Sequence, residues 1–188
     1  MRYTDHNTYA DHPGRVKLSK RKLRQVKKLV CTSFGETLFF HLRIPAVKEY
    51  VAYGDTQPAC VMSVSPLVIS AYSDEMDAVV MLRFPDALAQ QYKLSSGDRL
   101  VTVNTYRWLE GYEIAPDIFV GEHFLQRYSD FQPIVPLFIC KNETPVQEKC
   151  RLFDEETWET VTQKSRQYAA EHPDLIRDGF YYWKPQQA

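Results

Sequence analysis

The feature that most constrains this chain is a series of short apolar stretches, rich in β-branched and aromatic residues, with hairpin-length links between them. Residues 78–84 are an apolar run that predicts a buried, central strand, and residues 99–107 predict another. Residues 59–72 are also β-rich, but Pro66 imposes an edge, a bulge or a break because proline has no N–H to donate. Links this short favour antiparallel neighbours, since parallel strands need long crossovers.

Alternation of apolar side chains predicts a further strand over residues 37–44, which Pro45 closes. His41 lies on the face of this strand opposite the apolar side chains. A weaker signal places a strand over residues 47–53, and Pro133 and Pro136 bracket a strand over residues 135–140. The expected sheet therefore has about six strands and is mixed or mostly antiparallel.

Two longer helices have clear capping signals. Ser19 is a good N-cap for a helix over residues 19–33, and Gly35 lies just past its end, where a C-cap is expected. Asp154 caps a helix over residues 155–171. Together with the strands, these helices predict an α+β fold with a basic N-terminal helix and a C-terminal helix.

Shorter helices are expected over residues 86–94 and from residue 117 or 121 to residue 128. At roughly 100–200 residues per domain, the length of 188 residues predicts one domain. We assign residues 1–18 to an irregular N-terminal arm and residues 19–188 to a single α+β domain.

Charge is distributed unevenly along the chain, although the formal net charge is only -1. Residues 1–30 carry nine Lys/Arg and two Asp, a net charge of +7. The remaining 158 residues carry 14 Lys/Arg and 22 Asp/Glu, a net charge of -8. The basic segment therefore meets either an external polyanion or an acidic surface of its own chain or of a partner chain.

The helix over residues 19–33 carries a continuous basic face. At 100° per residue, its apolar side chains (Leu23, Val26, Leu29, Val30) share one flank, and only Lys22 breaks the division. Such a stripe can neutralise phosphates along a nucleic-acid backbone. The leading hypothesis is a binding module that contacts nucleic acid or another polyanion through Lys20, Arg21, Arg24, Lys27 and Lys28.

Two other classes of function stay open. One alternative is an enzyme that acts on a small molecule. It would use His41 or His123, with or without a cysteine, in a cleft of the sheet. The other alternative is a structural or oligomerisation role, in which the basic helix packs on the acidic surface of a neighbouring subunit.

Signatures of metal and cofactor sites are absent from the sequence. It holds no glycine-rich phosphate loop, no H-E-x-x-H and no G-x-S-x-G. No two cysteines have zinc-ligand spacing, so Cys31, Cys60, Cys140 and Cys150 are interpreted as reduced thiols. Two Asp-His pairs, at residues 5–6 and 11–12, lie in the arm, where ligands are poorly positioned. We expect neither a metal nor a cofactor.

Residues 84–103 resemble the strand–Pro–helix–Gly-Asp–strand segment of AbrB-type swapped-hairpin DNA-binding domains. Pro85 begins the helix and Gly97-Asp98 form the turn. Met81 stands where that family usually has an arginine, so no functional residue is transferred from the resemblance.

The beginning of the chain is polar and then basic, without the apolar core of a secretory signal. No apolar run approaches the ~20 residues that span a bilayer. We therefore expect a cytoplasmic protein that does not act at a membrane.

Overall fold

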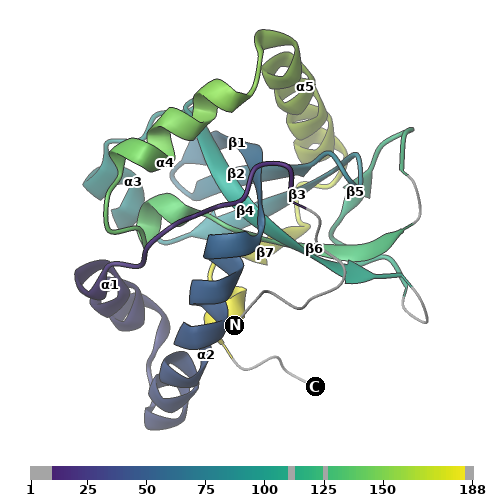
Figure 1. Ribbon diagram of the computed structural model, residues 1–188. Coiled ribbons are helices and arrows are strands. Elements are labelled where there is room, and N and C mark those ends of the chain that lie inside the picture. Colours follow the sequence, from purple (N-terminus) through teal and green to yellow (C-terminus); the bar gives the residue numbers. More distant parts are fainter. Residues whose placement is uncertain (1–9, 110–112, 125–126, 185–188) are drawn as a thin grey trace.

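A curled, mostly antiparallel sheet forms the centre of the protein in the computed structural model, which describes residues 10–109, 113–124 and 127–184 (Figure 1). In order across the sheet, the strands are β5 (Phe119–Val120), β3 (Ala78–Phe84), β2 (Leu67–Ser73), β1 (Asp55–Val64), β4 (Arg99–Trp108) and β6 (Tyr128–Ile134). A short β7 (Ile176–Asp178) pairs with β3 in parallel. The predicted α+β class, with a basic N-terminal helix and a C-terminal helix, is confirmed.

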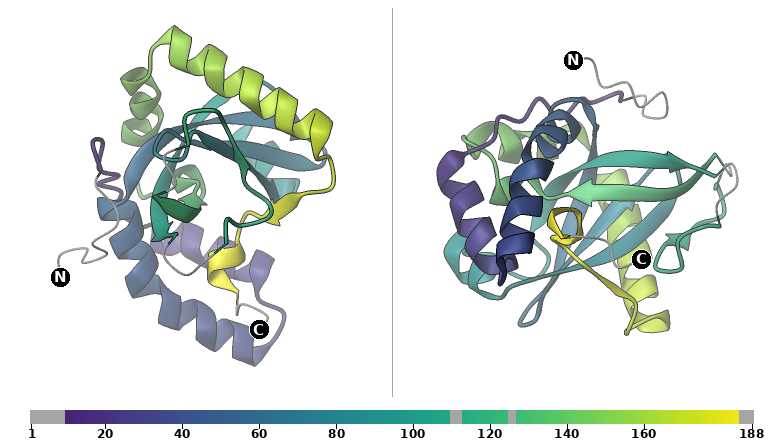
Figure 2. Two further views of the ribbon diagram at one scale, coloured as in Figure 1. Left: turned by 90° about the vertical axis from the view of Figure 1, so that its right-hand side faces the viewer. Right: turned by 90° about the horizontal axis from the view of Figure 1, so that it is seen from below.

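Apolar side chains cover both faces of the sheet. On one face, the main core includes side chains of α1 (Lys20–Val30), α2 (Phe34–Tyr53) and α3 (Ala87–Tyr92). On the other face lies α5 (Glu155–Glu171), whose Trp158 and Tyr168 are buried (Figure 2). Successive residues of β3 point to opposite faces of the sheet, which explains why this strand is apolar almost throughout.

The β-rich segment over residues 59–72 forms β1 and β2, and the break expected at Pro66 is the turn between these two strands. The strands expected over residues 78–84 and 99–107 form as β3 and β4, and β3 lies inside the sheet as predicted. The helix expected over residues 155–171 is α5, whose N-cap Asp154 accepts a hydrogen bond from the backbone N–H of Thr157.

The strands predicted over residues 37–44 and 47–53 are wrong, because both segments belong to α2. Ser33 and Glu36 form a capping box that starts this helix. Phe40 then stacks on Trp183, with 4.2 Å between the ring centroids. Gly35 lies in the first turn of α2 and does not cap α1, which ends at Val30.

Two further expectations differ from the structure. The strand predicted over residues 135–140 is a 3-10 turn (Pro136–Phe138) that follows β6. The helix predicted to end at residue 128 is absent from the described part of residues 117–128, which includes β5. Pro133 does not prevent β6 from forming, because this strand lies at the edge of the sheet and needs its N–H groups on one side only.

The described part of the predicted arm lies along the fold. The backbone N–H groups of Arg15 and Val16 donate to the carbonyls of Ala52 and Val51, at 2.8 and 3.0 Å. Gly14 approaches α2 so closely that a Cβ atom there would lie 2.3 Å from the carbonyl oxygen of Val51. Residues 1–9, with the first Asp-His pair, lie outside the described residues.

The structure adds two observations on membranes and metals. Among the helices that the structure describes, none is both long and apolar enough to span a membrane. Asp11 and His12 belong to no group of three or more metal-binding side chains in the described ranges.

Candidate nucleic-acid interface

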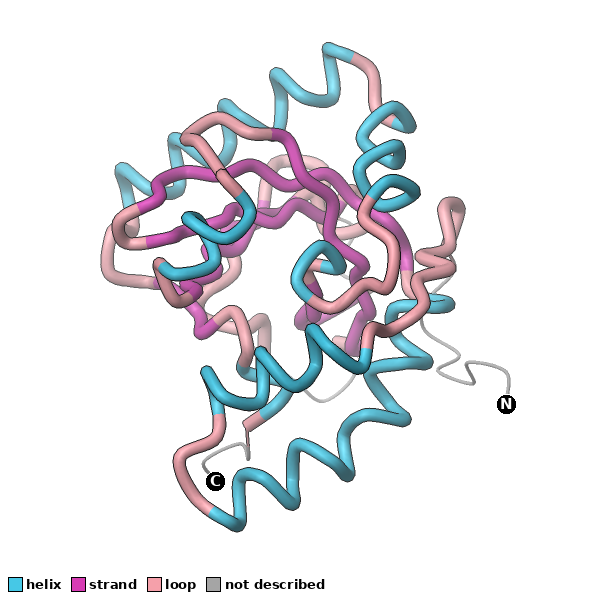
Figure 3. Tube along the Cα trace, turned by 90° about the vertical axis from the view of Figure 1, so that its left-hand side faces the viewer, coloured by secondary structure: helices cyan, strands magenta, loops and turns pink. Residues whose placement is uncertain are grey.

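The basic face of α1 is open to solvent. The side chain of its N-cap, Ser19, accepts a hydrogen bond from the backbone N–H of Lys22, and the helix buries Leu23, Val26 and Val30. Figure 3 shows α1 and α2 as a pair of helices on the side of the molecule away from α5. Of the five predicted contact residues, Lys27 is half-buried, whereas Lys20, Arg21, Arg24 and Lys28 are exposed.

These five cations have no carboxylate partner in the described part of the chain. The ion pairs found there involve six other cations: Lys22, Arg99, Arg127, Lys164, Arg177 and Lys184. The acidic side chains Asp74, Asp154 and Glu156 line a cleft beside α5, which lies far from α1 in Figure 1. The five charges of the α1 face are therefore not neutralised by these carboxylates.

Lys22, which interrupts the apolar flank in the sequence, anchors α1 to the body of the protein. Its side chain is only 4% exposed, and its Nζ lies 2.7 Å from both the carboxylate of Glu143 and the carbonyl oxygen of Leu137. The ammonium also lies 4.9 Å from the ring centroid of Tyr92. Burial disfavours the charge, but the hydrogen bond with Glu143 and the neighbouring groups outweigh it and raise the pKa of Lys22.

Helical periodicity places Leu29 on the buried flank of α1, but its side chain is 40% exposed. Lys22 and Leu29 are seven residues apart, so their side chains point in nearly the same direction from the helix. The segment around Leu137 and Glu143 covers Lys22, near the start of α1, and leaves Leu29 uncovered.

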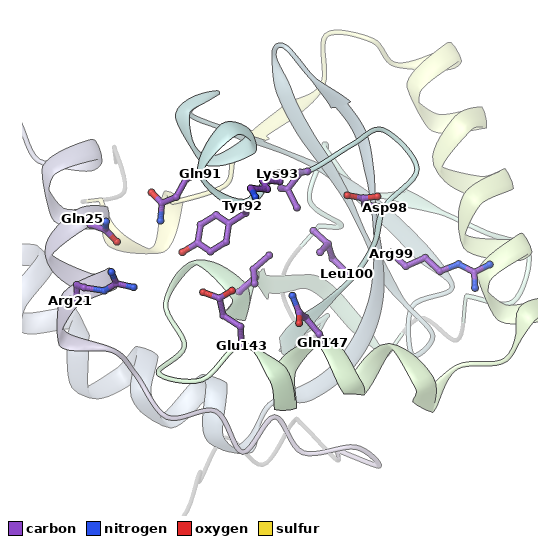
Figure 4. A pocket seen from close by; sticks show the side chains of 12 residues that line it. Arg21, Gln25, Gln91, Tyr92, Lys93, Asp98, Arg99, Leu100, Glu143 and Gln147 are labelled. Atoms are coloured by element: carbon purple, nitrogen blue, oxygen red, sulfur yellow. The ribbon is translucent and has the colours of Figure 1, made fainter.

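A cleft of about 680 Å³ opens between α1, α3 and α4 (Thr144–Glu148) (Figure 4). Arg21 belongs to both the basic face and the wall of this cleft, and Gln25 follows it one turn later. Gln91 and Gln147 bring two more side-chain amides from α3 and α4. The Oε1 atom of Gln25 is buried and has no hydrogen-bond partner among the residues described. The wall therefore combines three side-chain amides with the cation of Arg21 and the carboxylates of Asp98 and Glu143.

The two histidines of the enzyme hypothesis belong to different elements: His41 lies on α2 and His123 in the loop that follows β5. His41 is exposed on α2 and does not line any of the five main clefts of the described residues. His123 does line a cleft of about 660 Å³, together with Asp77 and Lys164. However, Asp77 accepts from the backbone N–H of His123 at 3.1 Å and not from its imidazole.

The carboxylate of Asp77 contacts three parts of the fold. Its carboxylate lies 2.8 Å from the Nζ of Lys164 on α5 and accepts the Tyr72 hydroxyl at 3.2 Å. Burial opposes its charge, but the hydrogen bonds from Lys164 and His123 outweigh burial and lower the pKa of Asp77. A Cβ atom at Gly121 would lie 2.1 Å from this carboxylate, so the close approach requires glycine.

The cysteines are unpaired, and two aromatic residues near the C-terminus are buried. All four cysteines are free, and burial raises the pKa of the Cys60 and Cys140 thiols. Tyr182 and Trp183 are buried in the main core and are not available for stacking on a ligand.

Comparisons with known proteins give no relative. No protein-family model matches the chain. No curated protein matches it. No solved structure matches it either. The resemblance to swapped-hairpin domains is limited to the local order of strand, helix, turn and strand, since β2 and β1 separate β3 from β4 in the sheet.

Proposed function

We propose that this protein binds nucleic acid through the basic face of α1. The observation that carries the proposal is the set of four exposed cations and one half-buried cation that have no ion pair within the described ranges. Lys22 supports it, because an anchored helix holds its outer charges in fixed positions and loses less entropy on binding.

The proposal predicts a specific dependence on salt. If four or five cations each neutralise one phosphate, the slope of log K against log salt is about -3.6 to -4.5 for duplex and about -2.8 to -3.5 for single strands. Duplex affinity then falls roughly 150- to 500-fold between about 50 and 200 mM salt.

The experiment is a salt titration of binding to duplex and single-stranded oligonucleotides. The test variant changes Arg21, Arg24, Lys27 and Lys28 to Gln. The control removes four cations elsewhere on the surface, with Lys48, Arg83, Arg151 and Arg166, all exposed, changed to Gln. We expect the test variant to lose most of its affinity and salt dependence, and the control to keep both. Absence of binding at about 50 mM salt, or equal losses in both variants, refutes the proposal.

A second candidate function, self-association, is favoured by the outer face of α2. Phe34, Leu38 and Leu42 follow one another at four-residue spacing and are 84%, 53% and 68% exposed. Monomers seldom leave such an apolar stripe uncovered, and two copies of α2 can cover each other's stripe by pairing about a two-fold axis.

Sedimentation at low and high salt tests this candidate. Association through the α2 stripe persists at high salt and is lost in a Leu38→Gln/Leu42→Gln variant. A chain that stays monomeric at about 100 µM is inconsistent with it.

A further inference from the structure

A second cleft, of about 360 Å³, lies between the N-terminal segment and the region around α4. One wall is formed by residues 14–17 and the other by residues 140–149. Backbone hydrogen bonds hold these walls in place: Arg15 N–H donates to Ala52, and Lys141 N–H donates to the carbonyl of Lys17 at 2.7 Å. The cleft is therefore built by the fold and is not a gap between loose side chains.

Four of the ten residues that line this cleft are cations, and none is a carboxylate. Lys17, Lys141 and Arg15 are exposed, and Lys149 is half-buried. None of the four forms an ion pair with a carboxylate that the structure describes. A concave surface with this charge concentrates anions.

Lys149 is the cation held most firmly. Its Nζ donates to the carbonyl of Pro13 and to the hydroxyl of Thr56, both at 3.0 Å. An ammonium has three N–H groups, so one is left without a partner among the described residues. Burial, and then the positive charge of Arg15, lower the pKa of Lys149, while Asp55 offsets them in part. The two cations therefore repel each other, and an anion between them relieves the repulsion.

The rest of the lining is largely apolar. Val16, Cys140 and Val146 are buried side chains, and Pro145 lies beside them. Arg15 has a φ of 50°, a left-handed conformation that non-glycine residues seldom adopt. Such conformations persist where the surrounding structure imposes them and are frequent at ligand sites.

We propose that this cleft binds a small aliphatic phosphate monoester. Cations from both walls suit the tetrahedral phosphate, whose oxygens point in several directions, better than a planar carboxylate. The apolar residues suit a short alkyl group, and the volume lies in the range of small-molecule sites. No aromatic side chain lines the cleft, so it offers no surface for stacking a base. This site does not depend on the basic face of α1.

The test uses n-butyl phosphate as the probe, with calorimetry for affinity and ¹H–¹⁵N spectra for location. We expect saturable binding with a Kd of about 1 mM or lower and shifted amide signals in residues 14–17 and 140–149. A Lys17→Gln/Lys141→Gln variant, which changes two exposed residues, raises the Kd about tenfold or more.

The control is Lys27→Gln/Lys28→Gln, which removes the same charge from the α1 face and leaves butyl phosphate binding unchanged. This control distinguishes the two proposals, because butyl phosphate binding at the cleft does not require nucleic-acid binding at α1. The inference is overturned if no saturable binding occurs, if the shifted signals lie on α1, or if both variants lose affinity equally. It is also overturned if inorganic phosphate or butyrate binds as tightly as butyl phosphate.

Discussion

Replacement of Lys22 by methionine tests whether this buried cation anchors α1. Methionine keeps most of the apolar stem and removes the ammonium, so the change isolates the polar contacts. The carbonyl of Leu137 loses its donor at 2.7 Å and retains only the weak thiol contact of Cys140 at 3.6 Å. An unpaired buried carbonyl costs about 1–3 kcal/mol.

The ion pair itself contributes less. The Glu143 side chain is 43% exposed, so water can solvate its carboxylate after the change, and the loss is about 0–1 kcal/mol. Removing the cost of burying the ammonium partly offsets both losses. We therefore expect Lys22→Met to lower the free energy of unfolding by about 2 kcal/mol.

Urea denaturation monitored by circular dichroism measures this loss. With a slope of about 2 kcal/mol per M, the midpoint moves by about 1 M. Lys20→Met, on the exposed face of the same helix, is the control and changes stability by less than about 0.5 kcal/mol. If Lys22→Met is neutral or stabilising, burial of the ammonium outweighs its contacts and Lys22 is not an anchor.

Three further outcomes are expected. Burial raises the pKa of Asp55 from 3.8 to about 6, so the folded protein binds this proton more tightly than the unfolded chain and loses stability as the pH rises through that interval. Asp55→Asn removes the loss of stability that comes from this carboxyl group, as measured by urea titrations at several pH values. An unchanged pH profile of stability contradicts the assignment. If nucleic acid binds to α1 as proposed, unpaired bases can reach the cleft beside Arg21 and paired bases cannot, so Gln25→Ala/Gln91→Ala weakens binding of single strands more than binding of duplex. Equal losses in a binding titration argue against base entry. Trp183→Ala lowers the free energy of unfolding by about 3–5 kcal/mol, since this fully buried ring stacks on Phe40. A loss below about 1 kcal/mol in urea denaturation shows that the C-terminal segment contributes little to the stability of the fold.

Local patterns in the sequence were sufficient for several elements. The apolar runs that became β1 to β4 and the capped helix α5 depend on contacts between residues close in the chain, or on which face is buried. The basic stripe of α1 follows from helical periodicity alone, so the candidate contact residues were identified from spacing. The capping box at Ser33 and Glu36 was also readable, and it competed with the alternating pattern of residues 37–44.

Contacts between residues far apart in the sequence determined the features that local patterns do not predict. Phe40 belongs to a helix that packs on Trp183, 143 positions later, and no local pattern indicates that pairing. Lys22 meets Leu137 and Glu143, more than a hundred residues away, so its role as an anchor is invisible in the sequence. The cleft lined by residues 14–17 and 140–149 is likewise formed by two segments that lie far apart in the sequence. Periodicity specifies which face of an element is apolar, whereas the partner of that face is specified only when the whole chain packs.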